Sequence, residues 1–168
     1  QYVGGDEVEK FEKNIALLLK TKHCIALNSG TDALTLGLHS LGVRKNDEVI
    51  TTSNSFIAST AVIVHLGAKP VFTDSTSLDN FNVSVDHIVS KITSNTKAIV
   101  IVHFAGFPMD LYDLKAVCAQ RGIALIEDCA HAPGASIKGE MCGSIADFSF
   151  FSFFSNKNLA VGEGGMVF

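Results

Sequence analysis

Residues 148–165 read FSFFSFFSNKNLAVGEGG, an apolar and hydroxyl-bearing run that leads to one lysine, Lys157, and a glycine-rich turn. The run is typical of a buried strand, with Lys157 following the point where such a strand would end. A lysine amine held among aromatic rings loses hydration of its charged form, which makes the neutral amine available as a nucleophile. Schiff-base chemistry requires such an amine. The alternative is a strand-end lysine whose ammonium reaches water from an apolar sheet.

The segments before this run alternate between apolar strands and amphipathic helices. Strands are expected at 24–27, 48–51, 69–73, 98–103 and 123–126, and helices at 5–20, 33–41, 56–66, 85–92 and 111–120. This order implies an α/β fold with three layers, in which helices cover both faces of a mostly parallel sheet. Periodicity predicts which helical residues face inward: Val8, Phe11, Ile15 and Leu18 in the first helix, and Ile57, Ala61 and Val64 in the third.

Composition excludes several classes of protein. The 168 residues are 47% hydrophobic, which fits one domain with a sizeable core. A formal net charge of −4 without a clustered basic run argues against nucleic acid as the partner. The apolar run 98–102 ends at His103, well short of the roughly 18 residues that a membrane-spanning helix needs. The four cysteines form no CxxC pair, so reduced thiols in a cytoplasmic protein are expected.

Both ends of the sequence predict a fragment. The chain begins at Gln1 without a methionine or a signal-like segment, and residues 166–168 read as the opening of another strand.

A strand, a turn of small residues and a helix start follow one another around residues 28–32. The first N–H groups of a helix have no partner within the helix, and the helix dipole favours negative charge there. Gly30 would let a phosphate approach the backbone, and Thr31 adds a hydroxyl. The alternative is a helix N-cap by Ser29 or Thr31 without a ligand. The spacing matches neither a Walker loop nor a GxGxxG fingerprint, which disfavours nucleoside triphosphates.

Other polar and aromatic side chains are expected at the same edge of the sheet. Glu127 and Asp128 end a buried strand, and a carboxylate that enters a core needs a cationic or donor partner. Asp128 could instead cap a helix. Asp128 and His131 could also be a metal pair, but spacing suggests no third ligand, so no metal site is expected. Phe56 is either a core residue or the partner of a flat aromatic ligand.

Taken together, four stretches resemble the sugar aminotransferase family, the DegT/DnrJ/EryC/StrS group of pyridoxal-phosphate (PLP) enzymes with the aspartate-aminotransferase-like fold type I. The resemblance covers essentially the whole chain. It is carried by NSGTDAL at 28–34, EDCAHAPGA at 127–135, FSFFSNKNL at 151–159 and GEGG at 162–165. Residues 1–168 would then be part of the large, cofactor-binding domain, without the C-terminal small domain.

The resemblance implies a role for each candidate residue. Lys157 would form the Schiff base with PLP and later move a proton, Asp128 would face the pyridine nitrogen, and His131 would lie near the phenolic oxygen. The other implied contacts are phosphate binding by Ser29, Gly30, Thr31 and Ser152, and ring stacking by Phe56.

The implied reaction transfers an amino group, usually from L-glutamate, to a keto group of a nucleotide-linked deoxysugar. Its products would enter surface glycans or secondary metabolites. The family forms homodimers that share active sites, so this fragment could lack much of the substrate site and be inactive alone. Alternatives are a PLP-binding scaffold without catalysis, and a related lyase or dehydratase. Some relatives that dehydrate carry a histidine in place of the lysine, so Lys157 favours transamination.

Overall fold

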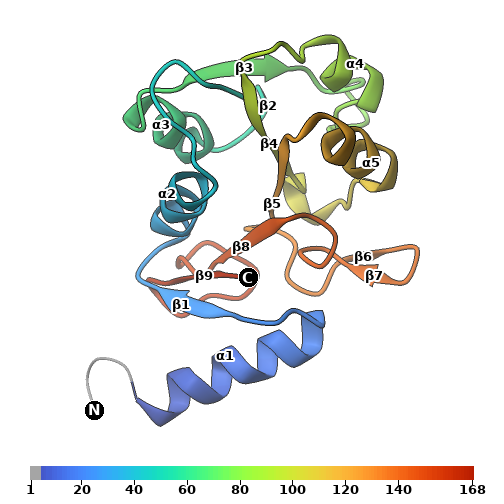
Figure 1. Ribbon diagram of the computed structural model, residues 1–168. Coiled ribbons are helices and arrows are strands. Elements are labelled where there is room, and N and C mark those ends of the chain that lie inside the picture. The colour runs from blue at the N-terminus through green and yellow to red at the C-terminus, as the bar shows by residue number, and fades with distance from the viewer. Residues whose placement is uncertain (1–4) are drawn as a thin grey trace.

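The structure of the protein is a computed structural model that describes residues 5–168 (Figure 1). Helices and strands alternate along most of the chain. In order they are α1 (Asp6–Leu19), β1 (Ile25–Leu27), α2 (Gly30–Ser40), β2 (Glu48–Thr52), α3 (Ile57–His65), β3 (Lys69–Thr73), α4 (Val85–Ser90), β4 (Thr96–Val102), the short 3-10 turn η1 (Phe104–Gly106), α5 (Tyr112–Arg121), β5 (Ala124–Asp128), β6 (Ser136–Ile137), β7 (Glu140–Met141), β8 (Phe148–Ser152) and β9 (Gly165–Val167). The predicted alternation is therefore confirmed.

Seven strands form one sheet in the order β1-β9-β8-β5-β4-β2-β3. The pairs from β8 to β3 are parallel, whereas β9 runs antiparallel to both of its neighbours, β8 and β1. Strands β6 and β7 form a separate hairpin. The prediction of a mostly parallel sheet is confirmed. Because the carboxyl ends of parallel strands meet at one edge, the residues that follow β4, β5 and β8 come together there.

Helices cover both faces of the sheet, as Figure 1 shows. Neighbouring residues of a strand point to opposite faces, so Val100 and Ile126 pack under α2 and α3 while Ile99 and Leu125 pack under α4 and α5. At the end of the sheet formed by β1, β9 and β8, α1 covers a third cluster that includes Phe151. The sheet is therefore the middle of three layers.

Two predicted helix faces are wrong in detail. In α1, Ile15 and Leu19 are buried, whereas Leu18 is 56% and Val8 38% exposed. In α3 the predicted inward residues Ile57, Ala61 and Val64 are exposed, and the buried ones are Ser59, Val62 and Ile63. The helix α3 itself carries apolar side chains on nearly all of its sides, so periodicity alone could not identify its inner face.

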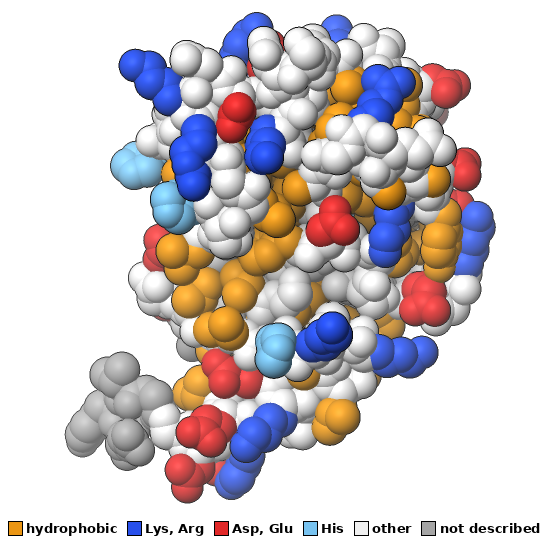
Figure 2. Space-filling model, viewed as in Figure 1, with side chains coloured by type: hydrophobic (Ala, Val, Ile, Leu, Met, Phe, Trp, Pro, Cys, Tyr) orange, Lys and Arg blue, Asp and Glu red, His pale blue; other side chains and the backbone are white. Residues whose placement is uncertain are grey.

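The surface carries exposed apolar side chains between the charged ones, as Figure 2 shows for one face. The large ones that are more than half exposed include Leu17, Leu36, Phe107 and Val161. The four cysteines are buried and unpaired, in keeping with the expected reduced thiols. Within residues 5–168, no helix has both the length and the apolar character needed to cross a membrane.

Candidate active site

A cavity of about 310 Å³ opens at the carboxyl edge of the sheet, beside the first turns of α2 and α3. The structure places all eight predicted site residues in its lining: Ser29, Gly30, Thr31, Phe56, Asp128, His131, Ser152 and Lys157. They come from loops that are far apart in the sequence. The parallel topology brings these loops together, because each follows a strand that ends at this edge or begins a helix there.

Lys157 lies in the turn after β8 and is partly buried. Its Nζ is 3.0 Å from Nε2 of His131 and 5.7 Å from the centre of the Phe56 ring. The Phe56 side chain is 65% exposed, so it is not a core residue. The lysine therefore contacts an imidazole and an aromatic face inside the cavity, and its amine does not simply extend into solvent.

Asp128 is the last residue of β5 and is only 6% exposed. Its Oδ1 accepts the N–H of Ala130 at 3.0 Å, and its Oδ2 accepts the hydroxyl of Ser59 at 3.3 Å. Burial raises the pKa of Asp128, an effect that the Ala130 N–H and the charge of Lys157 only partly offset. The carboxylate is thus held where a cationic ligand group would stabilise its charged form.

Sequence reasoning missed Ser59, whose hydroxyl also lies 3.0 Å from the hydroxyl of Ser55. Ser59 is 2% exposed, and 69 residues separate it from Asp128 in the sequence. The available signal was a hydroxyl in the first turn of a mostly apolar helix. That signal becomes informative only when α3 is known to begin beside the end of β5.

At the first turn of α2, Ser29 is the helix N-cap. Its Oγ accepts the N–H of Asp32 at 3.0 Å. Ser152, at the end of β8, packs directly on Gly30, where an added Cβ would lie 2.7 Å from the Cβ of Ser152. The short side chains let two hydroxyl groups and the helix start share one end of the cavity.

Gly165 in β9 packs against the backbone of Ser29 and Gly30 at this end of the cavity. A Cβ there would lie 2.3 Å from the carbonyl carbon and oxygen of Ser29, which are backbone atoms that cannot rotate away. We expect Gly165→Ala to shift the 29–30 segment, to lower the free energy of unfolding by about 1–3 kcal/mol, and to weaken binding of the PLP that the family resemblance implies.

Gly122→Ala is the matched control, because a Cβ at Gly122 meets open space at the end of α5, although its φ of 66° disfavours alanine. Thermal unfolding and PLP titration of both variants check this expectation. The Gly122 variant should lose stability and keep its PLP affinity. Unchanged PLP affinity in Gly165→Ala would contradict the expectation.

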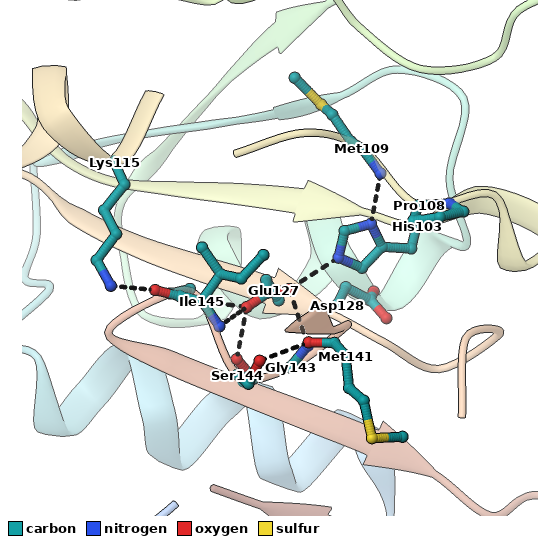
Figure 3. A network of polar contacts seen from close by, with 12 residues as sticks. His103, Pro108, Met109, Lys115, Glu127, Asp128, Met141, Gly143, Ser144 and Ile145 are labelled. Atoms are coloured by element: carbon teal, nitrogen blue, oxygen red, sulfur yellow. Dashed lines mark hydrogen bonds and ion pairs between the residues drawn. The ribbon is translucent and has the colours of Figure 1, made fainter. Parts of the chain in front are cut away.

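Glu127 precedes Asp128 and points to the opposite face, where it is fully buried (Figure 3). Five groups donate hydrogen bonds to its two carboxylate oxygens: His103 Nε2, Ser149 Oγ and the backbone N–H groups of Gly143, Ile145 and Ala146, at 2.8–3.3 Å. The expected need for donor partners is met by a loop that sequence reasoning did not connect to this strand.

The same region contains a cluster of potential metal ligands: His103, Glu127 and Cys129 have donor atoms within 4.8 Å of one another. Both Glu127 oxygens already accept N–H groups. Burial raises the pKa of the Cys129 thiol well above its ordinary value, so the sulfur keeps its proton. Glu127 and His103 are therefore committed to the protein's own hydrogen bonds.

The sheet order and the lysine-bearing loop give the chain the fold of PLP-dependent transferases of fold type I. The chain belongs to the DegT/DnrJ/EryC1/StrS aminotransferase family, which it matches over residues 1–168. It is 41% identical over 163 residues to GDP-perosamine synthase from Vibrio cholerae, covering 97% of this chain and 44% of that protein.

Solved structures agree with this assignment. An aminotransferase from Psychrobacter cryohalolentis superposes with a TM-score of 0.94 at 40% identity, over 99% of this chain and 42% of that one. The PLP form of Spr1654 from Streptococcus pneumoniae superposes with a TM-score of 0.91 at 36% identity, over 98% of this chain and 45% of that one. The chain therefore spans less than half of the length of these relatives.

The residues of the cavity fit PLP. A buried carboxylate, Asp128, needs a cationic partner, and a protonated pyridine nitrogen is one. The start of α2 offers N–H groups to a phosphate, and the bare Cα of Gly30 leaves room beside Ser152. An amine lies in the same cavity, at Lys157.

Proposed function

We propose that the whole protein is a PLP-dependent sugar aminotransferase that transfers the amino group of L-glutamate to a keto group of a nucleotide-linked sugar. One observation carries this proposal: the Lys157 amine and the buried Asp128 carboxylate line the same cavity, together with the start of α2. Membership of the family and the similarity to a GDP-perosamine synthase support the choice of a sugar nucleotide as substrate.

Each residue has a defined part in this proposal. The start of α2, with Gly30, Thr31 and Ser152, would bind the phosphate, and Phe56 would pack on the ring. Asp128 would hold a proton on the pyridine nitrogen. When bound, PLP supplies an electron sink for the carbon that loses its proton. Lys157 would attach the cofactor and afterwards carry the proton to and from that carbon.

We infer that residues 1–168 are a large part of the cofactor-binding domain, and that the remaining length of such proteins supplies the small domain. Exposed apolar side chains such as Phe107 and Val161 are consistent with further contacts of this domain. We also propose that the whole protein is a homodimer, in which a second copy completes the substrate site.

The experiment is a two-stage assay of the whole protein loaded with PLP. Glutamate alone should convert the bound cofactor to its amine form and release 2-oxoglutarate. A keto-sugar nucleotide should then restore PLP and yield the amino sugar, identified by mass spectrometry. If glutamate leaves the bound cofactor unchanged over hours, this result would contradict amino transfer and favour the alternative of a PLP-binding scaffold without catalysis. Loss of water or ammonia without transfer would instead favour a lyase or dehydratase.

A further inference from the structure

The two ring nitrogens of His131 meet different groups. Nδ1 is 3.3 Å from the backbone nitrogen of Ala105, which donates its N–H to it. Nε2 is 3.0 Å from Nζ of Lys157. A backbone N–H can only donate, so Nδ1 acts as the acceptor and carries no proton. The proton of the neutral ring then lies on Nε2 and points at the lysine.

This assignment fixes the direction of the contact with Lys157. An ammonium group has no lone pair and would meet the Nε2–H of His131 as a second donor. A neutral amine accepts that N–H. Burial lowers the pKa of His131, which favours the neutral ring at pH 7, so the position of its single proton determines the contact.

The Ala105 N–H reaches Nδ1 because the chain adopts an uncommon backbone conformation. Ala105 has φ 52° and ψ 21°, the left-handed region that costs a residue with a Cβ about 1–2 kcal/mol. The next residue, Gly106, has φ 83°, and a Cβ there would lie 3.0 Å from the carbonyl oxygen of His131. The turn thus packs on the backbone of the same histidine that it contacts through its N–H.

The turn is held from both sides. The backbone N–H of His103 donates to the carbonyl of Asp128 at 3.1 Å. The N–H of Met109 donates to Nδ1 of His103 at 3.1 Å, as Figure 3 shows. The ring of Phe104 meets that of His131 edge-on, with centroids 6.0 Å apart. Backbone strain such as that of Ala105 persists only where contacts of the surrounding structure enforce it, and it is concentrated at functional sites.

We propose that the left-handed turn at Ala105 is a positioning element that fixes His131 as a hydrogen-bond donor toward Lys157. Its backbone N–H selects the Nε2–H tautomer, which directs a hydrogen-bond donor at the Nζ of Lys157. On the proposed function, the same N–H would also face the cofactor, but the tautomer itself is a property of the protein without PLP.

The test is ¹⁵N NMR of the whole protein without PLP, labelled at histidine, at neutral pH. Long-range couplings to the ring carbon protons identify which ring nitrogen carries the proton. We expect the Nε2–H form of His131 in the wild type. A spectrum with the proton on Nδ1 overturns the proposal, whatever the protein's activity proves to be.

Two variants of Ala105 test the effect of the turn while leaving His131 itself unchanged. Ala105→Gly keeps the N–H and adopts the left-handed conformation without strain, so its tautomer should match the wild type. Ala105→Val disfavours that conformation and should move the N–H away from Nδ1, after which the Lys157 side chain can donate to Nε2 and the Nδ1–H form predominates. His103 resonances that stay unchanged show that the segment remains folded. The same tautomer in both variants overturns the proposal.

Discussion

Lys157→Ala is expected to abolish amino transfer by the whole protein, with a loss of at least about 10²–10⁴-fold from proton transfer alone. The variant removes the amine that contacts His131 and Phe56 in the cavity. It would also lose the covalent attachment of PLP, because the nucleophile that forms the bond is gone. Borohydride treatment followed by peptide mass spectrometry checks the attachment, and single-turnover kinetics check the rate.

Two further variants make this result specific. Lys157→Arg places a guanidinium near the Phe56 ring, but a guanidinium stays protonated at neutral pH, so this variant should be as inactive as Lys157→Ala. Lys138→Ala removes an exposed lysine that is ion-paired with Asp110 and should leave the rate unchanged. If Lys157→Ala kept a tenth of the wild-type rate, or if PLP remained attached to the chain, the role assigned to Lys157 would be wrong.

The sequence predicted the fold because its strands are short, apolar and separated by clear helical periods. It also predicted which loops would meet, since Asn28–Asp32, Asp128 and Lys157 follow strands or begin helices at a common edge. The direction of β9 could not be predicted. A three-residue strand pairs in either direction, and its antiparallel pairing with β8 and β1 depends on the turn at Gly162–Gly164.

The contacts behind the site could not be predicted either. Ser59 reaches Asp128 across 69 residues of sequence, and Glu127 is bound by N–H groups from a loop about 16–19 residues further on. Backbone donors such as that of Ala105 have no sequence signature, because every residue except proline carries one. The acid and the lysine are identified by residue type, whereas the groups that orient them are identified only by the fold.

Neighbouring side chains of a strand point to opposite faces, so Glu127 and Asp128 have different functions although they are adjacent in the sequence. Asp128 lines the cavity, where burial raises its pKa and a cationic ligand group would be favoured. Glu127 faces away and binds the loop at Gly143–Ala146 to the end of β5. The segment that carries His131 therefore runs from the end of β5 to a loop that Glu127 holds in place. Both ends of the segment are fixed, which leaves the imidazole and Asp128 little freedom to move apart.

Glu127→Ala is accordingly expected to lower the free energy of unfolding by about 3–5 kcal/mol, a large share of the usual total. It leaves buried donors of His103, Gly143 and Ile145 without their acceptor. The control is Glu9→Ala, which removes an exposed acid 3.8 Å from Lys13 and should cost less than about 1 kcal/mol. Urea titration of both variants measures the difference.

The pH dependence identifies the charge of Glu127 as the cause. Burial alone would raise the pKa of Glu127, but hydrogen bonds from His103, Gly143 and Ala146 lower it below the ordinary value of 4.5. The ionised carboxylate therefore stabilises the fold fully above about pH 4.5, and this contribution is lost as the pH falls through the lower, folded-state pKa. Glu127→Gln presents an amide that cannot ionise, so its stability deficit against the wild type should be largest near neutral pH. The deficit should shrink below pH 4.5, and a deficit that stays constant between pH 7 and pH 3 would contradict a charged Glu127 in the native fold.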